Sequence, residues 1–353
     1  MADRWNTRCI SREADDADRL VPPETPPRRI VQRAARRRAL IVGSAGQDGR
    51  LLFEQRSKSC DVVGIDVGGV RSYGLSSEEV ATLPTAPDIH DAAKMRELVR
   101  LGKPDEIYYL AARHHSAEER PDDAAELRES MSVNFLAFVN LLEAVRQEAP
   151  TCRVFYAGSS HMFGHPRHAM QSESTPFAPT NPYAISKVAG AHAGALYRER
   201  HGIHVSVGIL YNHESPLRAE RFVSQRIVLG ARRASREPGF KLSLGSLESV
   251  VDWGYAPDYV DAMVRIVQEG TPDDYIIATG EPHTVQDFVE CAFRAMGRDW
   301  REHVAVEPGR IHVSPGHDTG ALVGDSSKLR ARTGWAPSIT FEEMVTLLVA
   351  AAT

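Results

Sequence analysis

The chain has 353 residues, of which 42% are hydrophobic and 25% charged, so it can form one large domain or two smaller ones with a well-packed core. Its formal net charge of -5 argues against a nucleic-acid binder that relies on contacts to phosphates. No apolar run approaches the ~20 residues that a membrane span needs. The four cysteines form no Cys-x-x-Cys pair, so we expect no zinc site or disulfide framework, but free thiols in a reducing cytoplasm.

The first 37 residues differ in composition from the rest of the chain. They contain the pairs Pro22-Pro23 and Pro26-Pro27 and many arginines, and their apolar residues show no periodicity. They also lack the apolar h-region of a secretory signal. We therefore expect residues 1–37 to be a disordered extension.

A glycine-rich turn follows the first predicted strand. The apolar run over 39–43 is typical of a buried parallel strand, and a helix is expected to start at Arg50. Between them lies Gly43-Ser-Ala-Gly46-Gln47-Asp48-Gly49. Its glycines permit a tight turn and a close approach of the backbone to a pyrophosphate at a helix N-terminus. Because the pattern lies between a strand and a helix, it predicts a dinucleotide site rather than a structural turn.

The second predicted strand, over 61–66, ends on an acid. The carboxylate of Asp66 can accept hydrogen bonds from the adenosine ribose hydroxyls, and it would repel the 2′-phosphate of NADP. The sequence therefore favours NAD as the cofactor. Arg71 lies nearby in the sequence and keeps NADP open as the less favoured cofactor, and Asp66 could also be a solvated strand end.

Strands and helices alternate along the chain, which predicts an α/β fold with a Rossmann-like, doubly wound parallel sheet. We expect a short third strand before Asp88, a helix over about 91–101, a strand over 104–112 and a helix over 123–148. Ligands of open α/β sheets bind beyond the carboxyl ends of the strands. The residues expected to contact the cofactor at these ends are Asp88, Ile89, Leu110, Ala111 and Ala112.

Two further polar residues belong to these elements. His115, in the polar loop after the strand over 104–112, is a candidate substrate contact. Asn134 lies inside the helix over 123–148, where it could brace a proton relay or be a tolerated polar residue. The sequence leaves both roles of Asn134 open.

A serine, a tyrosine and a lysine form the predicted catalytic set. The fifth strand, over 152–157, leads to Ser159, and a helix starts near Asn181-Pro182 because proline suits a first helical turn. Tyr183 and Lys187 are four positions apart and therefore share one face of this helix. Lys187 can lower the pKa of Tyr183 and hold the nicotinamide ribose. Tyr183 can then take the proton of an alcohol while Ser159 bonds to the same oxygen.

The remaining predicted elements continue the pattern. We expect strands over 204–212 and 274–279, and helices over 181–202, 256–268, 285–296 and 340–351.

Together these motifs resemble extended short-chain dehydrogenases/reductases, and specifically GDP-mannose 4,6-dehydratases. The resemblance covers about residues 39–350, and its most specific stretches are Asn212-His-Glu-Ser-Pro216 and Asp252-Trp-Gly254. The other matching stretches are 43–49, 104–112, Met162-Phe-Gly164, 175–184, 277–281, Gly324-Asp-Ser-Ser-Lys328 and Gly334-Trp-Ala-Pro337.

The resemblance implies a Rossmann-like domain, mainly residues 38–212, and a smaller C-terminal substrate-binding lid, mainly 213–353, with segments that return to the first domain. It implies that the C4 hydroxyl of a nucleotide sugar is oxidised, that water is eliminated across C5 and C6, and that the hydride returns to C6. A homodimer or higher homo-oligomer, joined through the helices over 123–148 and 181–202, is also implied. The residues that match substrate contacts are Ser160, Asn212, Glu214, Arg218 and Arg226.

The chain also departs from the family pattern. Ser159 stands where the family has threonine, and His161 replaces the glutamate that takes the C5 proton. An imidazole, with an ordinary pKa of about 6.5, could do this work or bind substrate instead. Because His161 stands where the family has its base, we expect this residue to determine which reaction the chain catalyses.

Further departures remove positive charge. Leu217 and Val251 replace arginines, and a stretch that includes His317 and Asp318 replaces the family's Arg-Pro-x-Glu. Each lost arginine removes a bidentate partner for phosphate, so an altered substrate is expected. The arginines that remain as candidates to hold a phosphate are Arg218, Arg226, Arg232 and Arg233, although the last two could also be solvated helix charges.

Two other functions stay open. A nucleotide-sugar epimerase or 4-oxidoreductase would use the same relay of Ser159, Tyr183 and Lys187 without losing water. An NAD-binding protein without catalysis is the second alternative, but the intact relay argues against it.

Overall fold

The computed structural model describes residues 36–85, 87–114, 122–166, 168, 170–307 and 321–352. Residues 1–35 of the predicted extension, His115, His317 and Asp318 lie outside the described residues. The packed part of the chain begins at Arg36, whose guanidinium donates to the carbonyls of Ser57 and Ser59 at 3.0 and 3.3 Å.

A seven-stranded sheet with the order β10-β6-β5-β4-β1-β2-β3 forms the centre of the fold. Its strands pair in parallel except β3, which forms an antiparallel hairpin with β2. Both faces of the inner strands are covered, which explains why these strands are runs of apolar residues rather than alternating ones. The strands are β1 (Arg38–Val42), β2 (Asp61–Asp66), β3 (Gly69–Tyr73), β4 (Glu106–Tyr109), β5 (Arg153–Ala157), β6 (His204–Leu210) and β10 (Asp274–Ile277).

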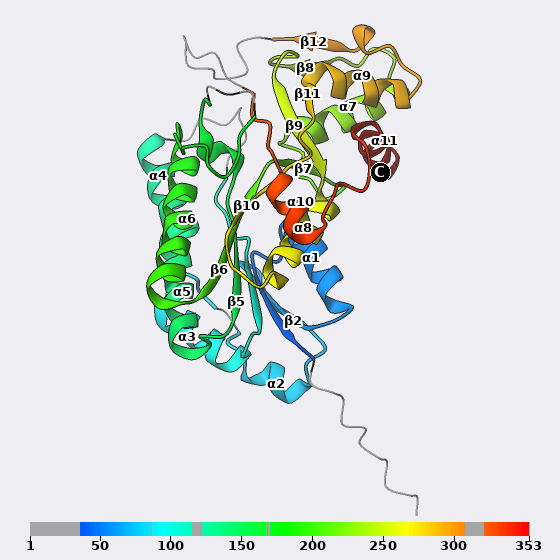
Figure 1. The fold of residues 1–353 in the computed structure, drawn as a ribbon. Coiled ribbons are helices and arrows are strands. Elements are labelled where there is room, and N and C mark those ends of the chain that lie inside the picture. Colours follow the sequence, from blue (N-terminus) through cyan, green and yellow to red (C-terminus); the bar gives the residue numbers. More distant parts are fainter. Residues whose placement is uncertain are drawn as a thin grey trace, which may run out of the picture. The chain divides into compact units, whose positions relative to one another are not determined.

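Helices cover the two faces of this sheet (Figure 1). On one face α3 packs against α5, α5 against α6, and α4 against α6; on the other, α8 packs against α1 and against β5 and β6. This confirms the predicted α/β, Rossmann-like doubly wound sheet. The helices are α1 (Gln47–Ser57), α2 (Ser77–Thr82), α3 (Ala92–Gly102), α4 (Asp123–Met131), α5 (Ala137–Glu148), α6 (Pro182–His201) and α8 (Ala256–Gln268).

The later part of the chain has a second, smaller hydrophobic core. It lies around Ile227, Trp253, Phe288 and Phe341, and α7, α9 and α11 pack around it. A three-stranded sheet, β11-β9-β7, and a two-stranded sheet, β12-β8, belong to the same part, whereas α10 packs on β10 and α8. The bounds are β7 (Asn212–Glu214), α7 (Val223–Arg236), β8 (Leu242–Leu244), β9 (Val250–Tyr255), β11 (Pro282–Thr284), α9 (Val285–Ala295), η3 (Trp300–Glu302), β12 (Val304–Val306), α10 (Ser327–Thr333) and α11 (Phe341–Ala351).

Three local predictions differ from the structure. Helix α1 starts at Gln47 rather than Arg50, so Gly49 lies inside it, where a Cβ would collide with the carbonyl oxygen of Gly43. The strand expected over 204–212 ends at Leu210, and the following residues form β7, which pairs with β9 in another sheet. The third strand is the hairpin β3 at 69–73, and none of the described residues between 83 and 91 is in a strand.

The helix predicted over 123–148 is interrupted by a π-helical segment, η1 (Ser132–Leu136), between α4 and α5. A π-helical turn loosens the usual hydrogen-bond ladder of a helix and often marks a functional position. Asn134 lies at its centre and is fully buried.

No helix in the described part of the chain is both long and apolar enough to cross a membrane.

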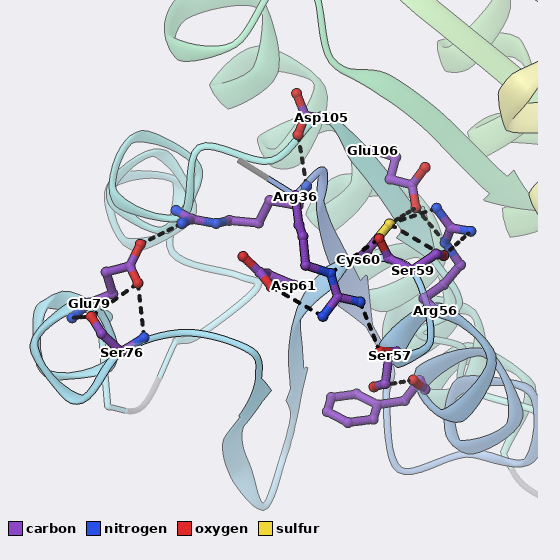
Figure 2. Close-up of polar contacts among 12 residues, drawn as sticks. Arg36, Arg56, Ser57, Ser59, Cys60, Asp61, Ser76, Glu79, Asp105 and Glu106 are labelled. Carbon is purple, nitrogen blue, oxygen red and sulfur yellow. Dashed lines mark hydrogen bonds and ion pairs between the residues drawn. The ribbon is translucent and has the colours of Figure 1, made fainter. Parts of the chain in front are cut away.

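At the amino ends of the strands, a buried polar cluster ties α1 to the sheet (Figure 2). Arg56 Nε donates to Glu106 Oε1 at 2.6 Å, and Arg56 Nη2 donates to Cys60 Sγ at 2.8 Å. Glu106 is 2% exposed and Arg56 6%, so neither charge has water as an alternative partner. Burial raises the pKa of the Cys60 thiol, which makes it a poor nucleophile at neutral pH.

Removing one member of this buried pair should destabilise the protein strongly. We expect Glu106→Ala to lower the free energy of unfolding by about 3–5 kcal/mol, because the guanidinium of Arg56 would stay buried without its counter-charge. The exposed pair Arg233–Glu237 supplies the control, since Glu237→Ala should change stability by at most about 0.5 kcal/mol. Denaturant unfolding monitored by circular dichroism measures both. A loss below about 1 kcal/mol for Glu106→Ala would contradict the role given to this pair.

Candidate active site

Predicted cofactor and catalytic residues lie at the carboxyl ends of β1, β2, β4 and β5. Between β1 and β4 the order of the strands reverses, which creates the crevice in which open α/β sheets bind ligands. Gly43 follows β1 and Leu110 follows β4, and the N–H of Leu110 donates to the carbonyl of Val42 at 2.8 Å. The two strands therefore stay paired up to the crevice itself.

The glycine-rich turn depends on missing side chains at this crossing. Gly43 has a φ of +91°, and a Cβ on it would lie 2.5 Å from the backbone nitrogen of Ala111. Gly46 is the N-cap residue of α1 and has no side chain to satisfy the free N–H groups of the first turn. The turn thus presents a bare helix N-terminus at the crevice, an arrangement that suits a pyrophosphate.

Asp66 and Arg71 both form hydrogen bonds with the glycine-rich turn. The carboxylate of Asp66 accepts the N–H of Ala45 at 2.9 Å and its neighbour's N–H, that of Val67, at 2.8 Å. Arg71 donates to the carbonyls of Ser44 and Gly49, so its guanidinium supports the turn. The acid is therefore at the turn's edge, whereas the nearby arginine is engaged by backbone oxygens.

A cavity of about 430 Å³ adjoins the turn. Leu217, which replaces an arginine of the resemblance, lines this cavity and contributes no charge to it. The residues that line it are Arg50, Phe53, Glu54, Ser57, Arg71 and Leu217.

Gln47 and Asp48 do not only border the turn; they bind the segment that follows β6. Gln47 Nε2 donates to the carbonyl of His213 at 3.1 Å, and Ser215 Oγ donates to Gln47 Oε1 at 2.8 Å. His213 Nε2 lies 2.9 Å from Asp48 Oδ2, and its Nδ1 lies 2.7 Å from the carbonyl of Tyr211.

The charges of this contact are coupled. Burial alone would lower the pKa of His213, but the carboxylate of Asp48 and two hydrogen bonds outweigh burial and raise it. Burial would raise the pKa of Asp48, but the imidazolium of His213 and hydrogen bonds outweigh that effect and lower it. The pair therefore joins the glycine-rich turn to β7 as an ion pair.

The other predicted cofactor residues lie before α3 and after β4. Asp88 Oδ1 accepts the N–H of His90 at 3.0 Å, and the carbonyl of Ile89 accepts from Asn140 at 3.2 Å. Ala111 is the residue against which Gly43 packs, and Ala112 follows it on the surface.

Ser159, Tyr183 and Lys187 converge at the end of β5. Lys187 is 1% exposed, and its Nζ donates to the carbonyl of Ala157, the last residue of β5, at 2.8 Å. The same Nζ lies 5.7 Å from the ring centroid of Tyr183 and 5.1 Å from that of Tyr156. Helix α6 begins at Pro182 with Asn181 as its cap, so its first turns carry both functional side chains to the strand end.

Burial dominates the electrostatics of this set. It raises the pKa of Tyr183 to about 12, although a hydrogen bond with Ser159 works in the opposite direction. It lowers the pKa of Lys187 to about 7. Lys187 therefore titrates near neutral pH, whereas Tyr183 stays protonated unless positive charge is close to it.

His161 lies in η2 (Ser160–Phe163), directly after Ser159. Its ring centroid is 6.0 Å from that of Tyr183, and the backbone N–H of His161 donates to Ser159 Oγ at 3.3 Å. Burial lowers the pKa of the imidazole, so it is neutral at pH 7. Ser160, beside it, is 2% exposed.

The structure also brings together two residues that the sequence analysis did not single out. His114 lies with its ring centroid 4.4 Å from that of Tyr183, and Phe222 stacks on His114 with centroids 5.6 Å apart. The sequence could have suggested His114 only through its position in the loop after β4. Phe222 comes from the distant N-terminus of α7, and nothing in the local sequence marks it.

Asn134 connects two walls of the site. Its Oδ1 accepts the N–H of Arg113 at 3.0 Å, and its Nδ2 donates to Ser186 Oγ on α6 at 2.8 Å. Its carbonyl, which lies in the π-helical segment, accepts the hydroxyl of Tyr156 at 2.7 Å. Asn134 thus braces the loop after β4 against the helix that carries Tyr183.

The predicted substrate residues lie on the segment from β7 to α7. Glu214 is 2% exposed and lies 3.3 Å from Arg218 Nε, and Arg218 in turn lies 3.6 Å over the ring of Phe222. Asn212 starts β7, while Arg226 donates to the carbonyl of Ser243 at 2.7 Å. Arg232 donates to the carbonyl of Val349, and Arg233 pairs with Glu237. Both guanidinium groups therefore already have partners within the smaller part of the chain.

Among the described residues, no three histidine, cysteine, aspartate or glutamate side chains form a group that could hold a metal ion.

The buried lysine makes a prediction about pH and stability. The pKa of Lys187 is about 7 in the fold and 10.5 ordinarily, so between these values the unfolded chain binds more protons and stability rises with pH. We expect the stability of the wild type relative to Lys187→Met to increase from pH 7 to pH 10, because the cost of burying the ammonium disappears. Denaturant titrations at both pH values measure this difference.

The matched control for this experiment is Lys94→Met, which removes an exposed lysine on α3. Its stability difference from the wild type should stay the same at the two pH values. A difference for Lys187→Met that is also independent of pH would show that this amine is not buried as described.

Comparison with known proteins gives a family for this site. The family model for GDP-mannose 4,6 dehydratase matches residues 40–348. GDP-mannose 4,6 dehydratase 1 of Arabidopsis thaliana is 36% identical over 335 residues, which cover 89% of each chain. The GDP-mannose 4,6-dehydratase of Vibrio cholerae is 30% identical over 355 residues, covering 89% of this chain and 93% of the relative.

Solved structures share the fold at lower identity. The dTDP-glucose 4,6-dehydratase of Bacillus anthracis, in complex with NAD, has a TM-score of 0.71 at 19% identity and covers 89% of this chain and 96% of its own. The UDP-glucose 4-epimerase of Thermus thermophilus, also in complex with NAD, has a TM-score of 0.70 at 24% identity, with 89% and 98% covered. These likenesses agree with the Rossmann-like sheet, and the sequence matches establish that the chain belongs to the GDP-mannose 4,6-dehydratase family of enzymes.

Proposed function

We propose that this protein is an NAD-dependent 4,6-dehydratase of a nucleotide sugar, with an altered active site. It oxidises the C4 hydroxyl of the sugar to a ketone and then eliminates water across C5 and C6. The observation that carries this proposal is the convergence of Ser159, Tyr183, Lys187 and His161 beside the glycine-rich turn. The names of the relatives support the same reaction class.

The cofactor proposal rests on the turn between β1 and α1. The bare helix N-terminus at Gly46 suits the pyrophosphate, and the carboxylate of Asp66 suits the adenosine ribose rather than a 2′-phosphate. When bound there, NAD supplies the capacity to accept a hydride and return it. Arg71, which could have favoured NADP, is engaged by the carbonyls of Ser44 and Gly49. The proposed cofactor site is completed by Asp88, Ile89, Leu110, Ala111 and Ala112.

Oxidation at C4 is the task of the buried relay. Tyr183 takes the hydroxyl proton as a phenolate, and Ser159 bonds to the same substrate oxygen. Because burial raises the pKa of Tyr183 to about 12, the phenolate needs a positive charge nearby, which protonated Lys187 provides. With its own pKa at about 7, Lys187 carries this charge in a substantial fraction of molecules at neutral pH.

Elimination begins with removal of the C5 proton, which the neighbouring C4 ketone makes acidic. We assign this step to His161, whose imidazole is neutral at pH 7 because burial lowers its pKa. The base is therefore ready in its proton-accepting form without carrying a negative charge. This difference from a carboxylate is the altered part of the active site.

The substrate is a nucleotide sugar that contacts the segment between β7 and α7. The proposed contacts are Asn212, Glu214, Arg218 and Arg226, together with Ser160 in η2. Leu217 and Val251 cannot bind phosphate as arginines would, so we infer a substrate that differs from GDP-mannose. His115 remains a proposed contact from the sequence.

The proposed assembly is a homodimer, in the cytoplasm, through helices α4, α5 and α6. Four large apolar side chains on these helices and their η1 junction are exposed, which supports a covered interface. They are Leu127, Leu136, Ile185 and Leu196, with exposed fractions of 37, 53, 41 and 40%.

Product mass tests the reaction. Incubated with a panel of nucleotide sugars that includes GDP-mannose, the wild-type protein should yield a product that has lost one water. Tyr183→Phe should reduce turnover by about 100-fold or more, because it removes the proton acceptor without changing the shape of the site. Mass spectrometry of the products follows both.

Two outcomes would contradict the proposed dehydration and identify a different reaction. A product of unchanged mass but different chromatographic retention would identify an epimerase, and loss of two hydrogens with net formation of NADH would identify a 4-oxidoreductase. Full turnover by Tyr183→Phe would show that the tyrosine is not the proton acceptor.

A further inference from the structure

Asp48 places a negative charge at the helix end that is proposed to bind the pyrophosphate of the cofactor. It is the second residue of α1 and lies in the first turn of that helix. The positive end of a helix dipole stabilises an anion, so the carboxylate and a pyrophosphate would compete for the same end of α1. Two anions at this distance also repel each other. The charge of Asp48 therefore opposes the proposed cofactor site unless another group balances it.

His213 is placed to balance this charge. Its Nε2 lies 2.9 Å from Asp48 Oδ2, and its Nδ1 lies 2.7 Å from the carbonyl oxygen of Tyr211. A carbonyl and an ionised carboxylate can only accept hydrogen bonds, so a ring between them bonds to both when it carries a proton on each nitrogen. The geometry thus fits an imidazolium, which makes the pair with Asp48 neutral as a whole.

The surroundings keep this pair in place and largely away from water. His213 is 8% exposed, and its ring stacks on that of Tyr259 on α8, with centroids 4.5 Å apart. Gln47 Nε2 donates to Asp48 Oδ1 at 3.2 Å and to the carbonyl of His213 at 3.1 Å. Arg218 also acts on both charges, but its guanidinium lies 3.3 Å from a carboxylate oxygen of Glu214. His213, by contrast, contacts Asp48 directly.

We propose that His213 is a positioning residue of the cofactor site, which neutralises Asp48 and so permits a pyrophosphate to bind at the glycine-rich turn. It acts through Asp48 rather than by contact with the cofactor. The inference rests on the proposed cofactor site and deepens it, because it assigns part of that site to β7, far from the turn in the sequence. The same ion pair also fastens β7 to α1, so the test has to separate its charge from its contacts.

Exchange of the charged groups separates these two roles. His213→Gln keeps a hydrogen-bond donor but removes the positive charge, which leaves Asp48 unbalanced. At pH 7 we expect this variant to bind NADH about 10-fold or more weakly than the wild type, measured by the fluorescence of bound NADH. Adding Asp48→Asn to His213→Gln removes the negative charge as well. The double variant should recover most of the wild-type affinity, although the ion pair is absent from it.

The loss should also depend on the phosphates of the ligand. ADP-ribose contains the pyrophosphate and should lose the same factor as NADH in His213→Gln. Adenosine contains no phosphate and should bind to the wild type and to this variant equally. Displacement of NADH measures the affinity of both ligands.

The matched control is His303→Gln, which removes another buried imidazole whose Nδ1 lies 3.2 Å from a carbonyl oxygen, that of Phe240. It should leave the affinity for NADH unchanged, and circular dichroism shows whether each variant is folded. If His213→Gln does not fold, Asp48→Asn alone provides the test. Affinity for NADH at or above that of the wild type supports the inference, and lower affinity contradicts it.

Three results would show that His213 does not act through charge, while the proposed function stands. They are wild-type affinity of His213→Gln for NADH, a double variant that binds as weakly as His213→Gln, and a loss for adenosine as large as that for ADP-ribose. If the wild type binds neither NADH nor NADPH, the proposed function itself fails, and the inference fails with it.

Discussion

The burial of one ammonium group against the end of β5 is the constraint on which the site depends. Lys187 has no access to water, and its Nζ is held by the carbonyl of Ala157. That bond joins the helix that carries Tyr183 to the strand that carries Ser159. Holding Lys187 in place therefore also holds Tyr183 and Ser159 relative to each other. The burial of Lys187 lowers its pKa to about 7, so its charge can change near neutral pH.

The proposed base beside this relay is a neutral imidazole rather than a carboxylate. A carboxylate as the base would bring a negative charge next to Lys187, whereas His161 is neutral until it takes a proton. A second neutral imidazole, His114, lies within ring contact of the same tyrosine. In the proposed reaction, a neutral imidazole as the base avoids burying an anion beside the C4 ketone.

Much of the fold could be predicted from the sequence, because its signals are local. The strand over 61–66 and the helix over 256–268 have the predicted bounds, since apolar runs and a proline at a helix start are decided within a few residues. The bounds failed where distant segments decide them. Gly49 lies in α1 because the turn packs back against Gly43. The residues of β7 lie outside the main sheet because they pair with β9, about 40 residues further along the chain.

The same distinction holds for the candidate site. The residues of the relay can be recognised from their types and spacing. The sequence did not show that Arg71 donates to backbone carbonyls, that His213 pairs with Asp48, or that Phe222 stacks on His114. Each of these contacts joins residues that are far apart in the chain or depends on the direction of a side chain. The family resemblance identified the position at which the glutamate is missing. Only the structure showed that a second imidazole, that of His114, lies beside Tyr183.

The claim that an imidazole has taken over the elimination is tested most directly at C5. In D2O, the wild-type protein should place deuterium at C5 of the dehydrated product. His161→Gln should still oxidise C4, yet return substrate without deuterium at C5 and make no dehydrated product, because nothing else in the account removes that proton. If His161→Gln exchanges C5 at the wild-type rate, the base is another group and the account is contradicted.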